Sequence, residues 1–67
     1  MINVTINGDP HSLDQELCLV DLLEKFDIEH DKVAIEHNLE IVPKTTFANV
    51  MVGDGDNLEI VHFIGGG

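Results

Sequence analysis

The sequence contains no arginine, a single cysteine and no long apolar run, and each absence excludes a class of protein. Only three lysines oppose 13 Asp and Glu residues, which gives a formal net charge of −10. Such a charge repels nucleic acid and anionic membranes, so neither is an expected partner. The lone Cys18 excludes an internal disulfide framework and a multi-cysteine metal centre. No run approaches the roughly 20 apolar residues that a membrane span requires.

The length and the first residues set further expectations. A chain of 67 residues has room for one domain. Residues 1–4 contain no basic segment followed by an apolar run, so no secretory signal is predicted. A lone cysteine is typical of the reducing cytosol. We therefore expect a cytoplasmic protein that is monomeric on its own.

The first half of the chain predicts a hairpin followed by a helix. Ile2, Val4 and Ile6 alternate with polar residues, which is typical of a half-buried strand. Asn7-Gly8 is a strong hairpin signal, and a second strand over residues 10–15 is expected at an edge. The period then changes. A helical stripe over residues 18–27 comprises Leu19, Leu22, Leu23 and Phe26.

The second half predicts the rest of a sheet. We expect strands over residues 33–36 and 58–64, with a short extended piece, Ile41-Val42, that ends at Pro43. Residues 44–49 are expected to form a turn or a 3₁₀ segment with Phe47 pointing inward, and residues 53–57 a reversal. This order predicts an α+β fold, a mixed sheet of four to five strands with one main helix packed across one face. The domain would span residues 1–64, with a flexible glycine tail at residues 65–67.

The three glycines directly follow an apolar strand. At average usage, three in a row at a chosen position arise by chance about 3 times in 10,000. Three extended residues reach at most about 10 Å, enough to place the carboxylate of Gly67 in another protein's active site. A free carboxylate is a poor acyl donor, but attack on ATP would convert it to an acyl-adenylate that a sulfur nucleophile can open.

Residues 55–67 closely resemble the C-terminal end of the ThiS family, the sulfur carriers of thiamin biosynthesis. Further matching stretches are residues 2–8, 19–23, 33–38 and 41–43. The resemblance therefore covers essentially the whole chain. It implies the ubiquitin-like β-grasp fold.

The resemblance also implies a function. Gly67 would bear the reactive carbonyl, and Gly66 and Gly65 would thread it into a partner; whether Gly65 belongs to the tail or to the strand stays open. The implied partners are an adenylating enzyme of the ThiF type, a thiazole synthase of the ThiG type and a cysteine-derived sulfur donor. The adenylating partner would use ATP and magnesium, so the carrier itself needs no bound cofactor. It would be a protein co-substrate and not an enzyme.

The last strand also suggests a docking surface. Glu59 indicates that one face of this strand is exposed to solvent. Val61 and Phe63 lie on the same face, so they are either covered by nearby residues or exposed to a partner. If they are exposed to a partner, the Ile41-Val42-Pro43 segment would extend the surface, provided that it pairs alongside. The predicted docking residues are Val61, Phe63, Ile64, Ile41, Val42 and Pro43.

Other features predict less. Cys18 is interpreted as a small residue at a helix start that caps poorly. The four histidines lack the spacing of a metal site, and none is expected. Two other functions remain open: a small subunit of the molybdopterin synthase type, which shares the sulfur chemistry, and a ubiquitin-like modifier or binding module. The residues before the glycines, Val61 to Ile64, contain no proline, which argues against the first.

Overall fold

The first hairpin forms as the alternation predicts. The computed structural model describes residues 1–63, and its first two strands are β1 (Ile2–Ile6) and β2 (Asp9–Leu13). The two residues that join them, Asn7 and Gly8, have φ values of 51° and 84°. Positive φ at both central residues matches the right-handed twist of a hairpin. The predicted Asn-Gly turn is confirmed.

The single α-helix is shorter than expected. The elements that follow the hairpin are β3 (Leu17–Cys18) and α1 (Leu19–Lys25). Asp27 adopts a left-handed φ of 59°, and the amides of Asp27 and Ile28 donate to the carbonyls of Glu24 and Leu23 at 3.0 and 2.9 Å. These two bonds form a Schellman motif. They end the helix at Lys25, although the apolar stripe extends to Phe26.

The second half of the chain completes two sheets. Its elements are η1 (His30–Lys32), β4 (Val33–His37), β5 (Glu40–Val42), η2 (Lys44–Thr46), β6 (Met51–Val52) and β7 (Asn57–His62). The main sheet has five strands in the order β2-β1-β7-β4-β5, with β7 parallel to β1 and antiparallel to β4. The sheet is mixed, as predicted. The short pair β3–β6 forms a second sheet that the residue pattern did not predict.

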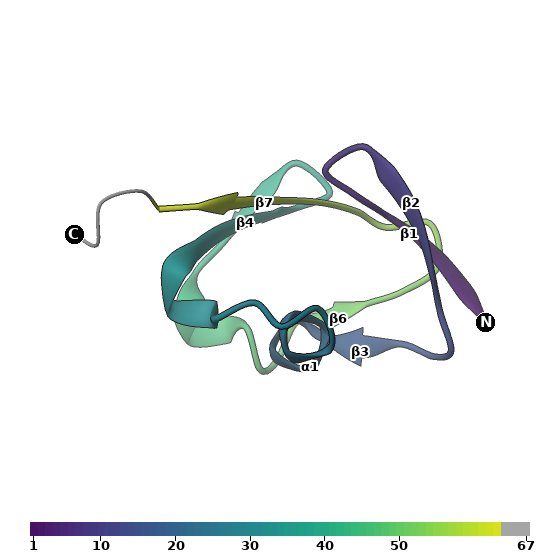
Figure 1. Cartoon of the computed structure of the whole chain (residues 1–67), viewed down its shortest axis with the longest axis horizontal. Coiled ribbons are helices and arrows are strands. Elements are labelled where there is room, and N and C mark those ends of the chain that lie inside the picture. The colour runs from purple at the N-terminus through teal and green to yellow at the C-terminus, as the bar shows by residue number, and fades with distance from the viewer. Residues whose placement is uncertain (64–67) are drawn as a thin grey trace.

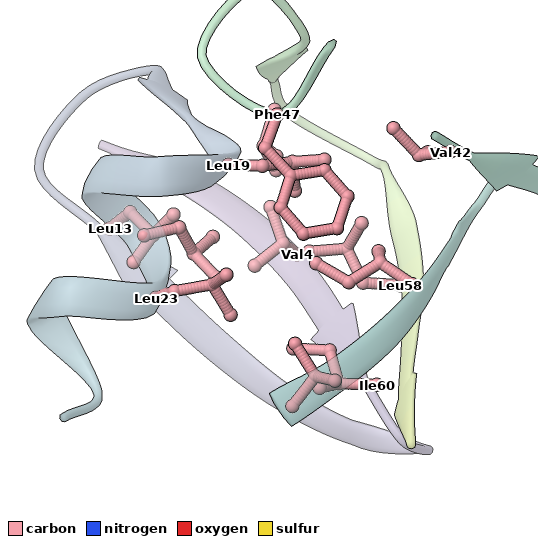
Figure 2. Close-up of a cluster of buried hydrophobic side chains, with 12 residues drawn as sticks. Val4, Leu13, Leu19, Leu23, Val42, Phe47, Leu58 and Ile60 are labelled. Carbon is pink, nitrogen blue, oxygen red and sulfur yellow. The ribbon is translucent and has the colours of Figure 1, made fainter. Parts of the chain in front are cut away.

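The helix and the small sheet lie together on one side of the main sheet (Figure 1). Between these layers lies a core of twelve hydrophobic side chains: Val4, Leu13, Leu19, Leu22, Leu23, Val33, Ile35, Val42, Phe47, Val52, Leu58 and Ile60. Phe47 follows η2, points inward as expected, and meets Leu19 and Val4 in the close-up (Figure 2). Among residues 1–63, no helix lies on the other face of the main sheet (Figure 1). Within residues 1–63, no helix has the length and apolar character needed to cross a membrane.

Candidate functional site

The predicted transfer site begins where β7 ends. The residues assigned to the tail and its root, Ile64, Gly65, Gly66 and Gly67, lie outside the described residues. The described part of the site is therefore β7, Phe63 and their neighbours. The strand β7 has a neighbour on each side, but β1 pairs only with its start, at Asn57 and Leu58, so the ladder with β4 holds its end.

The start of β7 is fixed by hydrogen bonds to two other segments. The Thr5 amide donates to the Asp56 carbonyl at 3.0 Å, and the Asn57 amide donates to the Asn38 side-chain oxygen at 2.8 Å. The Asp56 carboxylate accepts from the Gly53 amide at 2.8 Å and from His37 Nε2 at 2.8 Å. An ionised carboxylate only accepts hydrogen bonds, so His37 Nε2 carries the proton in this pair.

These contacts shift the acidity of Asp56. Burial raises the pKa of the Asp56 carboxyl, but hydrogen bonds from the Gly53 amide, His37 and Asn38 lower it, together with the charge of His37. The lowering contributions prevail, and the pKa lies below its usual value. The folded state therefore favours the ionised carboxylate of Asp56, whose hydrogen bonds help hold the loop that leads into β7.

The end of β7 is tied to the two 3₁₀ turns. The Phe63 amide donates to the Lys32 carbonyl at 2.9 Å, one step beyond the last paired residues of β4 and β7. Lys44 Nζ lies 4.8 Å from the centroid of the Phe63 ring and donates to the Asp31 carbonyl at 2.7 Å. Residues from η1 and η2 thus meet at the root of the tail.

The face of the main sheet that carries no helix displays the predicted apolar residues. Val61 and Phe63 are 60% and 55% exposed, and Ile41 is 78% exposed. Pro43 is exposed as well. The expectation that Val61 and Phe63 are uncovered is confirmed, and their binding of a partner stays a prediction.

Val42 requires a correction. The segment β5 pairs with β4 and not with β7, and Ile35 lies opposite Val42 in that ladder. Because neighbouring residues of a strand point to opposite faces, this register turns Val42 into the core while Ile41 faces solvent. Val42 is only 9% exposed and is not part of a docking surface.

The same face carries a repulsive pair. Glu36 of β4 lies directly opposite Glu59 of β7, and Ile41 lies on the other side of Glu36. Like charges placed opposite each other destabilise a sheet. A cationic side chain from another protein would relieve that repulsion beside the exposed Val61.

The residue pattern did not predict the part played by Lys44. Lys44 lies 19 positions before Phe63 in the sequence, and no local period connects them. Their contact depends on β4 and β7 pairing, which brings η1 and η2 to the end of β7. The only signal in the sequence was the aromatic residue Phe63 close to the glycines, and it does not indicate which residue Phe63 contacts.

The remaining candidates contribute no site within the described chain. Across residues 1–63, no three His, Cys, Asp or Glu side chains are grouped so that they could hold a metal ion. Cys18 occupies the N-cap of α1 in an extended conformation and makes no capping hydrogen bond through its side chain. This agrees with the interpretation of Cys18 as a poor cap.

A five-stranded mixed sheet with one α-helix across one face defines the ubiquitin-like β-grasp class. The crystal structure of the thiamine biosynthesis protein ThiS from Geobacter metallireducens superposes with a TM-score of 0.86 at 33% identity. The match covers 98% of this chain and 100% of that one.

Sequence comparisons give the family. The model of the ThiS family matches residues 4–67. The sulfur carrier protein ThiS of Bacillus subtilis is 45% identical over 47 residues, which cover 70% of this chain and 71% of that protein. The chain belongs to the ThiS family.

A further relative has a different length. The thiazole synthase of Paramagnetospirillum magneticum is 47% identical over 66 residues, which cover 98% of this chain. The chain spans 20% of the length of that protein and also 20% of the thiazole synthase of Magnetococcus marinus.

Proposed function

We propose that this domain is a sulfur carrier of thiamine biosynthesis and that the carboxyl group of Gly67 carries the sulfur. One observation carries the proposal: in a ThiS-family domain, the strand that leads to Gly65-Gly66-Gly67 is the central strand of the sheet. A carrier needs a rigid body that presents a narrow acyl group, and glycine leaves that group without a Cβ. The proposal requires Gly67 to be the terminal residue of the working protein.

The chemistry would proceed in two steps on the partner enzyme. A carboxylate oxygen of Gly67 attacks the α-phosphorus of ATP, forming an acyl-adenylate and releasing pyrophosphate. A hydrosulfide equivalent from a cysteine-derived donor then attacks the acyl carbon, and AMP leaves, so that a thiocarboxylate remains. Magnesium in the partner's site would neutralise the phosphate charges. The domain supplies the acyl group and acts as a co-substrate, and the catalytic groups belong to the partner.

The proposed acceptor of the sulfur is a thiazole synthase. Support comes from the Paramagnetospirillum magneticum protein of that name, which contains a segment 47% identical to this chain within a polypeptide about five times as long. Joining a carrier to the enzyme that it serves raises their effective concentration. We infer that this domain delivers its sulfur to an enzyme of that kind.

The proposed docking surface comprises Val61, Phe63, Ile41 and Pro43. The repulsion between Glu36 and Glu59 favours a partner with a basic group at that position. The net charge of −10 would also speed association with such a surface. An adenylating enzyme of the ThiF type is the proposed partner.

Intact mass tests the proposal. The purified chain is incubated with ATP, magnesium, the adenylating enzyme of the same organism and a sulfide source. We expect one oxygen to be replaced by one sulfur, and we expect no change in a variant that lacks Gly66 and Gly67. An unchanged mass of the full chain with its own partner would refute the proposal.

A second experiment distinguishes the carrier from a ubiquitin-like modifier. A ubiquitin-like modifier would form isopeptide bonds with lysine side chains of other proteins. Trypsin digestion of a cell extract would then yield lysines that carry residues 45–67 of this chain, because Lys44 is its last tryptic site. The carrier proposal expects no such modified lysines. It also expects that cells whose carrier lacks the glycine tail grow only when thiazole is added.

A further inference from the structure

Phe63 is the last described residue before the glycines, and its backbone is held although its ring is exposed. Its amide donates to the Lys32 carbonyl at 2.9 Å, which adds one bond after the β4–β7 ladder has ended. The bond ties the chain to η1 at the point where β7 stops. Phe63 is thus the last place at which the sheet controls the direction of the chain.

The side chain of Phe63 is held by a second residue, Lys44. Its ammonium lies 4.8 Å from the ring centroid, well inside the distance at which a cation is attracted to an aromatic face. The same ammonium donates to the Asp31 carbonyl at 2.7 Å, which fixes the long side chain in one position. Lys44 therefore links η1, η2 and Phe63.

The choice of contacts is notable for so acidic a chain. With 13 acidic residues and three lysines, a carboxylate partner would be easy to find. Lys32 pairs with Glu29 at 3.4 Å, whereas neither Lys25 nor Lys44 forms an ion pair among residues 1–63. The charge of Lys44 is directed instead at a ring and a backbone carbonyl beside the tail.

We propose that Lys44 is a positioning residue for the reaction at Gly67. By holding Phe63, it fixes the position of the last described residue before the glycines. A partner enzyme that binds at Gly67 would then meet the domain with this residue already ordered. This inference rests on the proposed sulfur-carrier function and adds a residue to it.

Adenylation kinetics give the first test, measured as ATP–pyrophosphate exchange with the ThiF-type enzyme. An exposed cation–aromatic contact corresponds to about a two- to fivefold effect, so Lys44→Ala should raise the KM for the carrier by about that factor and leave kcat unchanged. Lys44→Arg, which can still stack on the ring, should restore most of the loss. Lys25→Ala removes the same charge from the exposed end of α1 and should change KM little.

A double variant tests whether Lys44 acts through the ring. Phe63→Leu keeps an apolar side chain but removes the aromatic face, and it should raise KM by a similar factor. Because both changes break one contact, Lys44→Ala combined with Phe63→Leu should be no worse than the more damaging single variant. Two independent effects that multiply would overturn the proposal.

Amide hydrogen exchange, followed by NMR in the free carrier, supplies a readout that does not depend on the partner. Lys44→Ala should speed exchange of the Phe63 amide relative to Lys25→Ala, while both variants keep the same thermal midpoint. Unchanged exchange at Phe63, or an equal rise of KM in Lys44→Ala and Lys25→Ala, would refute the positioning role. If the wild-type chain is not adenylated by its own partner, the sulfur-carrier function itself fails.

Discussion

The side-chain amide of Asn7 makes with Ile60 the two hydrogen bonds that a neighbouring strand would make. Its Oδ1 accepts from the Ile60 amide at 2.7 Å, and its Nδ2 donates to the Ile60 carbonyl at 3.1 Å. The strand β1 ends one residue earlier, at Ile6. Asn7 therefore supports β7 on the side where β1 has already turned away.

The first prediction removes this support. Asn7→Gly keeps the positive φ of 51° accessible but deletes both hydrogen bonds. Each such bond contributes about 0.5–1.5 kcal/mol, so the free energy of unfolding should fall by about 1–3 kcal/mol. Urea unfolding measures this. Asn49→Gly is the control, because it introduces the same glycine at an exposed position, and equal losses in the two variants would contradict the role of the amide.

The second prediction concerns the turn between β4 and β5. Asn38 and Leu39 have φ values of 52° and 73°, and Leu39 is 80% exposed. A leucine in the left-handed region costs about 1–2 kcal/mol, whereas Asn-Gly is the preferred pair for such a turn. Leu39→Gly should therefore raise the thermal midpoint. Leu39→Ala removes the exposed side chain but keeps a Cβ, so an equal gain in that variant would show that strain is not the cause.

The third prediction is a pH dependence. Folding holds the pKa of Asp56 below its unfolded value, so the folded state binds fewer protons on this group. The stability that Asp56 contributes is complete above the unfolded pKa of about 3.9 and is lost as the pH falls through the folded pKa. Asp56→Asn should be less stable than wild type at neutral pH, and the difference should shrink below about pH 4.

Urea midpoints at several pH values check this sign. Asp14→Asn provides the charge control, because Asp14 is exposed. A constant difference between Asp56→Asn and wild type across the acid range would mean that the Asp56 contacts act without their charge.

The fourth prediction tests the docking surface. Burying a valine side chain against a partner is worth about 1.5–3 kcal/mol, so Val61→Asp should lower kcat/KM for adenylation by about tenfold or more. Its own stability should change little, because Val61 is exposed in the free domain. Met51→Asp is the matched control, since Met51 is an exposed apolar residue on β6 in the other sheet. Equal losses in the two variants would show that added negative charge, and not this surface, is responsible.

Local pattern predicted much of the architecture. The alternation at Ile2, Val4 and Ile6, the Asn7-Gly8 turn and the leucine stripe each act over a few residues, and each appears in the structure. The exposure of Val61 also followed from its alternation with Glu59. The boundaries were less accurate, because the helix stops at a left-handed Asp27 that hydrophobic period does not reveal.

Contacts between distant segments could not be predicted. Ile41 and Val42 are both apolar, so the sequence does not say which of them faces the core; the register with Ile35 decides it. Asn7 and Ile60 are 53 positions apart, and the contact between Lys44 and Phe63 exists only after β4 and β7 have paired. Such contacts depend on which strands become neighbours in the sheet, and the propensities of nearby residues do not determine the strand order.

The place of β7 in the middle of the sheet has a mechanical consequence. A force applied at the C-terminal end of β7 acts first on its antiparallel ladder with β4 and reaches the two parallel pairs with β1, at Asn57 and Leu58, only at the other end of the strand. A partner that draws in the end of the chain therefore pulls on a strand with a neighbour on each side and not on an edge strand.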